Sequence, residues 1–152
     1  ADQAEHNYMD YGIQLGRRFR ALKAWMVIRN LGTQGFSNRI RENVRLARLF
    51  ASWIDGDPQF ETVAPVIMAV VCFSVAPPAA KIMTLICDEV DEVNRRLVDA
   101  VSRTGQAYLT HTTLNGRIAM RLAVGNVLTT ERHLKSVYDL LRRELAHVVA
   151  TR

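Results

Sequence analysis

An Asn-Gly pair at residues 115 and 116 constrains the fold of this chain more than any other local feature. It separates two runs, 107–114 and 117–124, that are rich in apolar and β-branched residues. Asn-Gly between two such runs is the strongest short signal for a β-hairpin, because both residues of a tight hairpin turn need a positive φ. We therefore predict an antiparallel hairpin over residues 107–124.

The second strand of this hairpin also carries a candidate binding residue. Period-two alternation places apolar side chains on one face of the strand, namely those of Ile118, Met120, Leu122 and Val124. Arg121 lies on the opposite face between two alanines, which leave open space around its guanidinium group. Such an arrangement could receive a carboxylate in bidentate fashion. The alternative is a solvated sheet face that merely carries arginines, and the pattern alone favours this alternative.

Two helices are predicted at the start of the chain. Apolar residues recur at helical spacing over 15–31, and Gly32 stands where a left-handed C-terminal cap is expected. Ser37 or Asn38 is then expected to cap a second helix that runs to about Ile54. The wide apolar faces of both helices need a cover that we expect to come from outside this chain.

The remaining pattern predicts a small α+β domain. Turn residues at 55–58 end the helices, and strands are expected next, at 60–63 and 66–75. Further helices are expected from Asp88 to about residue 105 and from Thr129 or Thr130 onward, with the hairpin between them. The predicted fold class is α+β: two leading helices, then a small antiparallel sheet with helices packed on one face. We place the domain boundary between residues 1–56, the connecting part, and residues 57–152.

Charge is unevenly distributed along the 152 residues. Residues 15–50 hold eight arginines and Lys23 but only one acid, Glu42, which gives this segment a net charge of +8. A basic block of this kind favours nucleic acid, an anionic ligand, or acidic protein outside the chain as a partner. Two cysteines are too few for a secreted disulfide scaffold, so we expect a reducing, cytoplasmic location. Prolines interrupt the longest uncharged run, so no membrane span and no membrane partner are expected.

The sequence lacks the common catalytic motifs. It contains no Walker loop, no dinucleotide-binding glycine motif and no Gly-x-Ser-x-Gly elbow. The four histidines lack the spacing of zinc ligands. Four acids at 88–92 are interpreted as a solvated helix start rather than a metal site. We therefore assign no catalytic and no metal-binding residue.

A longer motif points to a known family. The stretch DYGIQLGRRFRALKAW at 10–25 closely resembles a signature of the group II pyridoxal-phosphate-dependent amino acid decarboxylases. The resemblance continues in DPQFETVAP at 57–65 and VCF at 71–73. It extends to LNGRIAMR at 114–121 and TTE at 129–131. Together these motifs cover nearly the whole chain.

The resemblance implies a C-terminal fragment of a fold-type I enzyme. Members of the family are obligate dimers, and their cofactor lysine follows Asn-Pro-His in a large upstream domain. The only lysines here are Lys23, Lys81 and Lys135, and none has that context. The parent enzyme would thus be a carboxy-lyase that uses pyridoxal 5′-phosphate. The fragment would be inactive alone and would need the large domain, a second subunit and an amino acid substrate.

The resemblance also suggests two substrate-binding residues. Gly16 matches a position where relatives bring the backbone close to the substrate pocket, and Arg121 matches an arginine that in some relatives lies near the substrate carboxylate. No residue of this chain is assigned to the cofactor. The alternatives are a basic nucleic-acid-binding module, which we consider the weaker one, and an assembly module that dimerises through its first two helices.

Overall fold

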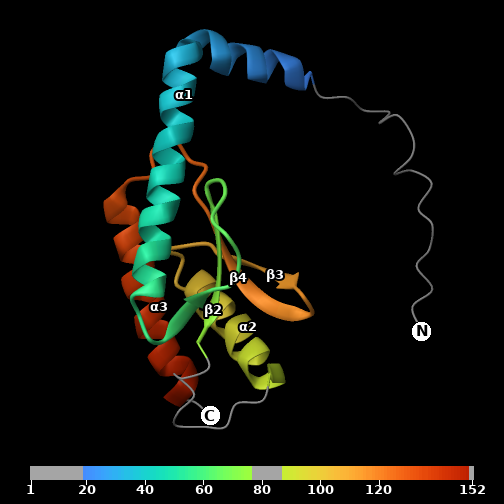
Figure 1. Cartoon of the computed structure of the whole chain (residues 1–152), viewed down its shortest axis with the longest axis vertical. Helices are drawn as coiled ribbons and strands as arrows, with labels where there is room; N and C mark the ends of the chain where they lie inside the picture. Colours follow the sequence, from blue (N-terminus) through green and yellow to red (C-terminus); the bar gives the residue numbers. More distant parts are fainter. Residues whose placement is uncertain (1–18, 77–86, 151–152) are drawn as a thin grey trace, which may run out of the picture. The chain divides into compact units, whose positions relative to one another are not determined.

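A computed structural model describes residues 19–76 and 87–150 of the chain. The chain divides into two compact units, Ala1–Ser37 and Asn38–Arg152. The first unit holds the N-terminal part of helix α1 (Arg20–Asp55), and the second holds the remainder of α1 and every other described element (Figure 1). Within the described residues, no helix is long and apolar enough to cross a membrane.

Helix α1 is interrupted by one residue in a non-helical conformation. Gly32 has φ 63° and ψ 175°, so the positive φ expected at this glycine is confirmed, but its ψ lies outside the left-handed helical region of the predicted cap. The predicted start of a second helix at Ser37 or Asn38 is wrong, because the chain is already helical over residues 33–37. One glycine absorbs the whole change of backbone direction, so no connecting loop is needed.

The sheet has four antiparallel strands in the order β1-β2-β4-β3. Their bounds are Phe60–Thr62 for β1, Val70–Val75 for β2, Thr110–Leu114 for β3 and Arg117–Ala123 for β4. The strand predicted at 66–75 therefore begins at Val70, four residues later than predicted. Thr62 already pairs with Phe73, so the chain needs the intervening residues 63–69 to reverse direction between two adjacent strands.

The predicted hairpin between β3 and β4 is confirmed. Asn115 and Gly116 form its turn with φ values of 51° and 78°. Leu114 pairs directly with Arg117 across this two-residue turn. Both positive φ values match the turn type that the right-handed twist of the strands favours. The first strand is shorter than predicted, since it begins at Thr110 instead of residue 107.

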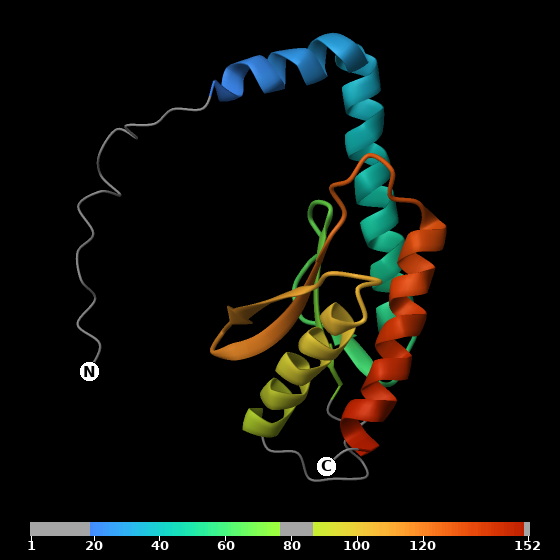
Figure 2. The same cartoon turned by 180° about the vertical axis from the view of Figure 1, so that it is seen from behind.

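Helices α2 (Cys87–Arg103) and α3 (Glu131–Ala150) complete the domain (Figure 2). One face of the sheet joins these helices and the end of α1 in a single apolar core. Phe73 of β2 lies at its centre, with its ring 5.6 Å from that of Phe50 in α1 and 6.3 Å from that of Phe60 in β1. Each ring pair meets edge to face, a geometry that adds stability beyond the buried area. The predicted α+β class with a small antiparallel sheet is thus confirmed.

Candidate functional site

Strand β4 presents its arginines on the sheet face opposite the core. Met120 and Leu122 are buried, whereas Arg117, Arg121 and Ala123 are exposed. The expected alternation therefore holds at these positions. Ala119 is the exception, because it lies on the arginine side but is only 2% exposed.

Arg121 is held at one edge of its guanidinium group. Its Nε atom donates a hydrogen bond to Oγ1 of Thr110, at 3.1 Å. Thr110 stands directly opposite Arg121 in the β3–β4 register, and Cys72 stands opposite it on β2. Among the described residues, no carboxylate lies within ion-pair distance of Arg121. The guanidinium of Arg121 thus has no counter-ion among the described residues.

Arg117 has a different environment from Arg121. Its Nε lies 3.2 Å from Oδ1 of Asp91 in α2, whose side chain is only 12% exposed. This pair joins the start of β4 to the first turns of α2. Arg117 is therefore engaged in the structure of the domain, and Arg121 is the better candidate to bind a ligand.

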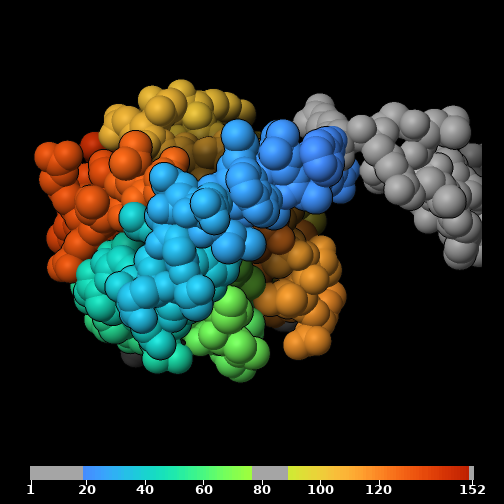
Figure 3. All heavy atoms as spheres, turned by 90° about the horizontal axis from the view of Figure 1, so that it is seen from above, coloured from blue at the N-terminus to red at the C-terminus, as the bar shows by residue number. Residues whose placement is uncertain are grey.

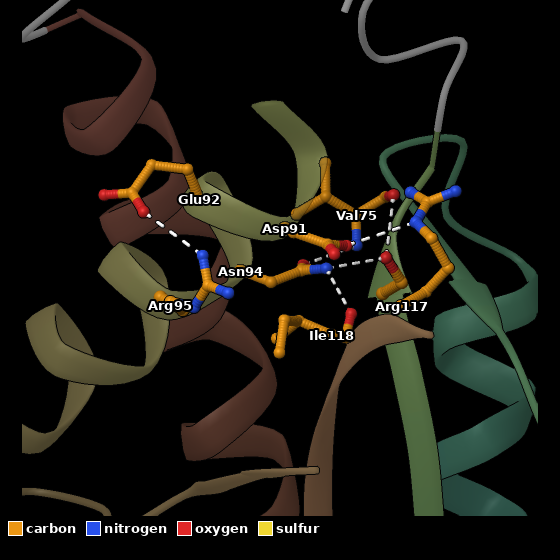
Figure 4. Close-up of polar contacts among 8 residues, drawn as sticks. Val75, Asp91, Glu92, Asn94, Arg95, Arg117 and Ile118 are labelled. Atoms are coloured by element: carbon orange, nitrogen blue, oxygen red, sulfur yellow. Dashed lines mark hydrogen bonds and ion pairs between the residues drawn. The ribbon is translucent and has the colours of Figure 1, made fainter. Parts of the chain in front are cut away.

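Next to this pair, Asn94 of α2 links two strands (Figure 4). Its Oδ1 accepts the N–H of Val75 at 3.1 Å, and its Nδ2 donates to the carbonyl of Ile118 at 2.9 Å and to Oγ of Ser74 at 2.8 Å. Asn94 is fully buried. The β2–β4 pairing ends at Phe73 and Met120, so the amide of Asn94 bridges the strands just beyond their last pair.

A second buried polar cluster joins α3 to the turn after α1. Oδ2 of Asp57 accepts a hydrogen bond of 2.8 Å from the hydroxyl of Tyr138 and lies 3.2 Å from Nε of Arg142. Oδ1 of Asp57 accepts the N–H of Gln59 at 2.9 Å. Burial raises the pKa of Tyr138, and the hydrogen bond to Asp57 adds to this shift. The sequence indicated only a turn at Asp57, because an aspartate between Gly and Pro is typical of solvated turns.

The larger hollows of the domain do not coincide with Arg121. An open groove of about 800 Å³ is lined by Trp53, Tyr138 and Lys135, with acidic and basic side chains of α3 around it. Arg121 lines none of the described hollows. On the arginine side of the sheet, a hollow of about 190 Å³ is lined by Ser74, Arg117 and Ala119, but Arg121 does not line it. A second body would have to complete a site around Arg121.

The remaining predicted residues fall as follows. Gly16 lies outside the described residues, as does Lys81. Lys23 is exposed on α1, and Lys135 is paired with Asp139 while its ammonium group lies 4.9 Å from the centre of the Tyr138 ring. Neither described lysine lies in an enclosed pocket that could hold the pyridoxal ring. The described part of the chain therefore does not fit the cofactor by itself.

The structure also shows the partners of one arginine of the basic segment and tests whether acidic side chains gather into a metal site. In the described part of the basic segment, Arg45 forms ion pairs with Glu42 at 2.8 Å and with Glu131 of α3 at 3.8 Å. The hydrogen bond from Arg45 lowers the pKa of Glu42. Among the described residues, no group of three His, Cys, Asp or Glu side chains could hold a metal ion.

Comparisons with known proteins place this geometry in a family. Residues 2–76 match the pyridoxal-dependent decarboxylase conserved domain. The chain is 38% identical to phenylacetaldehyde synthase of Arabidopsis thaliana over 94% of its own length and 28% of that protein. It is 36% identical to aromatic-L-amino-acid decarboxylase of Catharanthus roseus, with 90% of this chain and 26% of that protein covered.

Solved structures agree with these matches. The crystal structure of Oryza sativa TDC with PLP and tryptamine aligns with a TM-score of 0.79 and 37% identity, covering 91% of this chain and 29% of that one. Mouse CSAD, at 23% identity and a TM-score of 0.74, shares the fold.

The fold and these matches define the class. This chain is homologous to part of the fold-type I, pyridoxal-phosphate-dependent amino acid decarboxylases, which confirms the resemblance seen in its motifs. Within that class, its relatives at 36–38% identity include an aromatic-L-amino-acid decarboxylase and a phenylacetaldehyde synthase. The chain spans about 28% of the length of the relatives it matches.

Proposed function

We propose that this chain forms the small C-terminal domain of a pyridoxal-phosphate-dependent decarboxylase of aromatic amino acids, in which Arg121 binds the substrate carboxylate. The observation that carries the proposal is the uncompensated charge of Arg121 on the open face of the sheet. The chain's relatives, aromatic-L-amino-acid decarboxylase among them, support the substrate class.

The reaction requires a group that binds and orients the substrate carboxylate, and Arg121 is suited to this role. Decarboxylation requires that the substrate carboxylate be held in one orientation before its bond to the α-carbon breaks, and a guanidinium group binds a carboxylate through two parallel hydrogen bonds. Pyridoxal phosphate, when bound in the completed enzyme, accepts the electrons released as carbon dioxide leaves. The contribution of this chain would be to bind and orient the carboxylate.

Exposed apolar side chains support the need for a partner. Phe19, which directly precedes α1, and Trp25 and Met26 in the N-terminal part of α1 are each more than half exposed. In the second unit, the loop between β1 and β2 projects from the surface in green in Figure 3 and carries Ile67 and Met68, which are 76% and 59% exposed. Apolar clusters of this kind mark protein interaction sites. We propose that the cofactor-bearing part of the parent enzyme covers them and that the parent is a homodimer.

We also propose a cytoplasmic location for the parent enzyme. Cys72 is a free thiol at a half-buried position of β2, which suits a reducing compartment. Localisation of the tagged parent protein by microscopy tests this proposal, and a signal confined to the secretory pathway would contradict it.

The function is tested in the completed enzyme, with this chain joined to the cofactor-bearing part. Replacing Arg121 with methionine should raise KM for the aromatic amino acid by about ten- to a hundredfold, as expected when a charged hydrogen bond pair is lost. Arg95→Met is the matched control, because within the described residues this exposed arginine of α2 pairs only with its neighbour Glu92 at 3.5 Å.

Binding of the amine product provides a second readout. The amine lacks the carboxylate, so its inhibition constant should not change in the Arg121→Met enzyme. A KM that stays within twofold of the wild-type value would refute the proposed role of Arg121. Decarboxylation by the isolated 152-residue chain would refute its dependence on a cofactor-bearing partner.

A further inference from the structure

Thr110 is the residue that fixes the orientation of Arg121. It is the first residue of β3 and faces Arg121 directly across the strand pair. Its Oγ1 accepts the Nε–H of Arg121 at 3.1 Å. Among the described residues this is the one hydrogen bond that the Arg121 side chain makes. The other residues around Arg121 on this face include Ala119, Ala123 and Cys72, which are too small to enclose it.

The hydrogen bond decides which edge of the guanidinium group remains available. A guanidinium can receive a carboxylate either through Nε and one Nη or through both Nη atoms, because its five N–H groups form a rigid planar fork. The contact with Thr110 occupies the Nε–H. The Nη1–Nη2 edge is therefore the one left for a bidentate ligand.

We propose that Thr110 is a positioning residue that presents the Nη1–Nη2 edge of Arg121 to the substrate carboxylate. This inference rests on the proposed function of Arg121. Threonine suits the task because its branched Cβ leaves few χ1 rotamers, so the hydroxyl stays in one place relative to the strand. Arg121 then loses less side-chain freedom on binding, which lowers the cost of capturing the carboxylate.

The chain provides a matched control for this residue on the same strand. Thr112 lies two residues further along β3 on the same face, is also partly exposed, and faces Ala119 instead of an arginine. Thr110→Val removes the hydroxyl and keeps the branched shape, and Thr112→Val makes the same change where no arginine depends on it. Thr110→Ser keeps the hydroxyl and should rescue the function.

The measurements use the completed enzyme with its cofactor. Thr110→Val should raise KM for the aromatic amino acid by about five- to tenfold, the loss expected for one hydrogen bond to a charged group. The value of kcat should stay within twofold. Inhibition by the amine product should not change, because that ligand has no carboxylate for Arg121 to bind. Thr112→Val and Thr110→Ser should resemble the wild type.

The outcomes separate the two proposals. If Arg121→Met raises KM but Thr110→Val behaves like Thr112→Val, the positioning role is refuted and the function of Arg121 stands. If Arg121→Met leaves KM unchanged, the proposed function itself fails. Equal weakening of amino acid and amine binding by Thr110→Val would indicate a general structural defect and would overturn the inference. The double variant should bind no more weakly than Arg121→Met alone, and additive losses would contradict the coupling.

Discussion

Replacing Asn94 with alanine is expected to destabilise the domain by about 2–5 kcal/mol, because one buried and one partly buried backbone group would each lose a hydrogen bond partner. These groups are the N–H of Val75 and the carbonyl of Ile118, which lie 3.1 and 2.9 Å from the side-chain amide. Water cannot readily replace the amide, because Asn94 is fully buried. The loss should lower the melting temperature by roughly 2–4 °C for each kcal/mol in a chain of this size.

Urea denaturation followed by circular dichroism measures this change, with the denaturant slope as a check that the unfolded state is unaltered. Asn94→Leu provides the sharper variant, because leucine fills similar space and leaves the same two backbone groups unpaired. Asn126→Ala is the control: it removes an exposed side-chain amide whose one hydrogen bond among the described residues is from the N–H of Leu128, at 2.8 Å. If Asn94→Leu has the same free energy of unfolding as the wild type, the side chain at this position stabilises the domain by packing. The hydrogen bonds of the Asn94 amide would then contribute nothing, contrary to this prediction.

Two further changes probe the turn chemistry and the second polar cluster. Tyr138→Phe should cost about 1 kcal/mol by removing the hydrogen bond to Asp57. Because the folded-state pKa of Tyr138 is raised, the contribution of its neutral hydroxyl is complete below the ordinary tyrosine pKa and is lost as pH rises through the folded-state value. Unfolding measured between pH 8 and about 12 should therefore show a steeper alkaline loss for the wild type than for Tyr138→Phe, and equal slopes would contradict this assignment. Gly116→Ala should cost about 1 kcal/mol from backbone strain alone, since φ is 78° and nothing lies within 4 Å of the added Cβ. Gly125→Ala, with equal space and no positive φ, should be neutral, and equal effects of the two changes would refute the strain argument.

The parts of the fold that depend on local chemistry could be predicted from the sequence. The hairpin turn is an example, because Asn115 and Gly116 tolerate the positive φ values that the turn requires. The start of β2 could not be predicted in the same way. Residues 66–69 are as apolar as the strand that follows, and only the pairing of Thr62 with Phe73 shows that they belong to the connection.

The sequence identified Arg121 as the candidate binding residue, but it could not identify the residues that contact Arg121. Alternation along β4 indicated that Arg121 faces away from the core, and its exposure agrees. The partner Thr110 lies eleven residues away in sequence, and its contact depends on the register of the hairpin. Asn94 was missed because a polar residue in a helix usually faces solvent, and nothing local indicates that its amide bridges two strands.

The apolar core also has a consequence for synthesis of the chain. Leu46 and Phe50 of α1 share that core with Leu141 and Leu145 of α3, which are made more than ninety residues later. Helix α1 therefore leaves the ribosome well before α3, one of its packing partners, exists. Until α3 has emerged, the part of this core that α3 covers stays exposed in the nascent chain, so chaperone binding should persist through that interval.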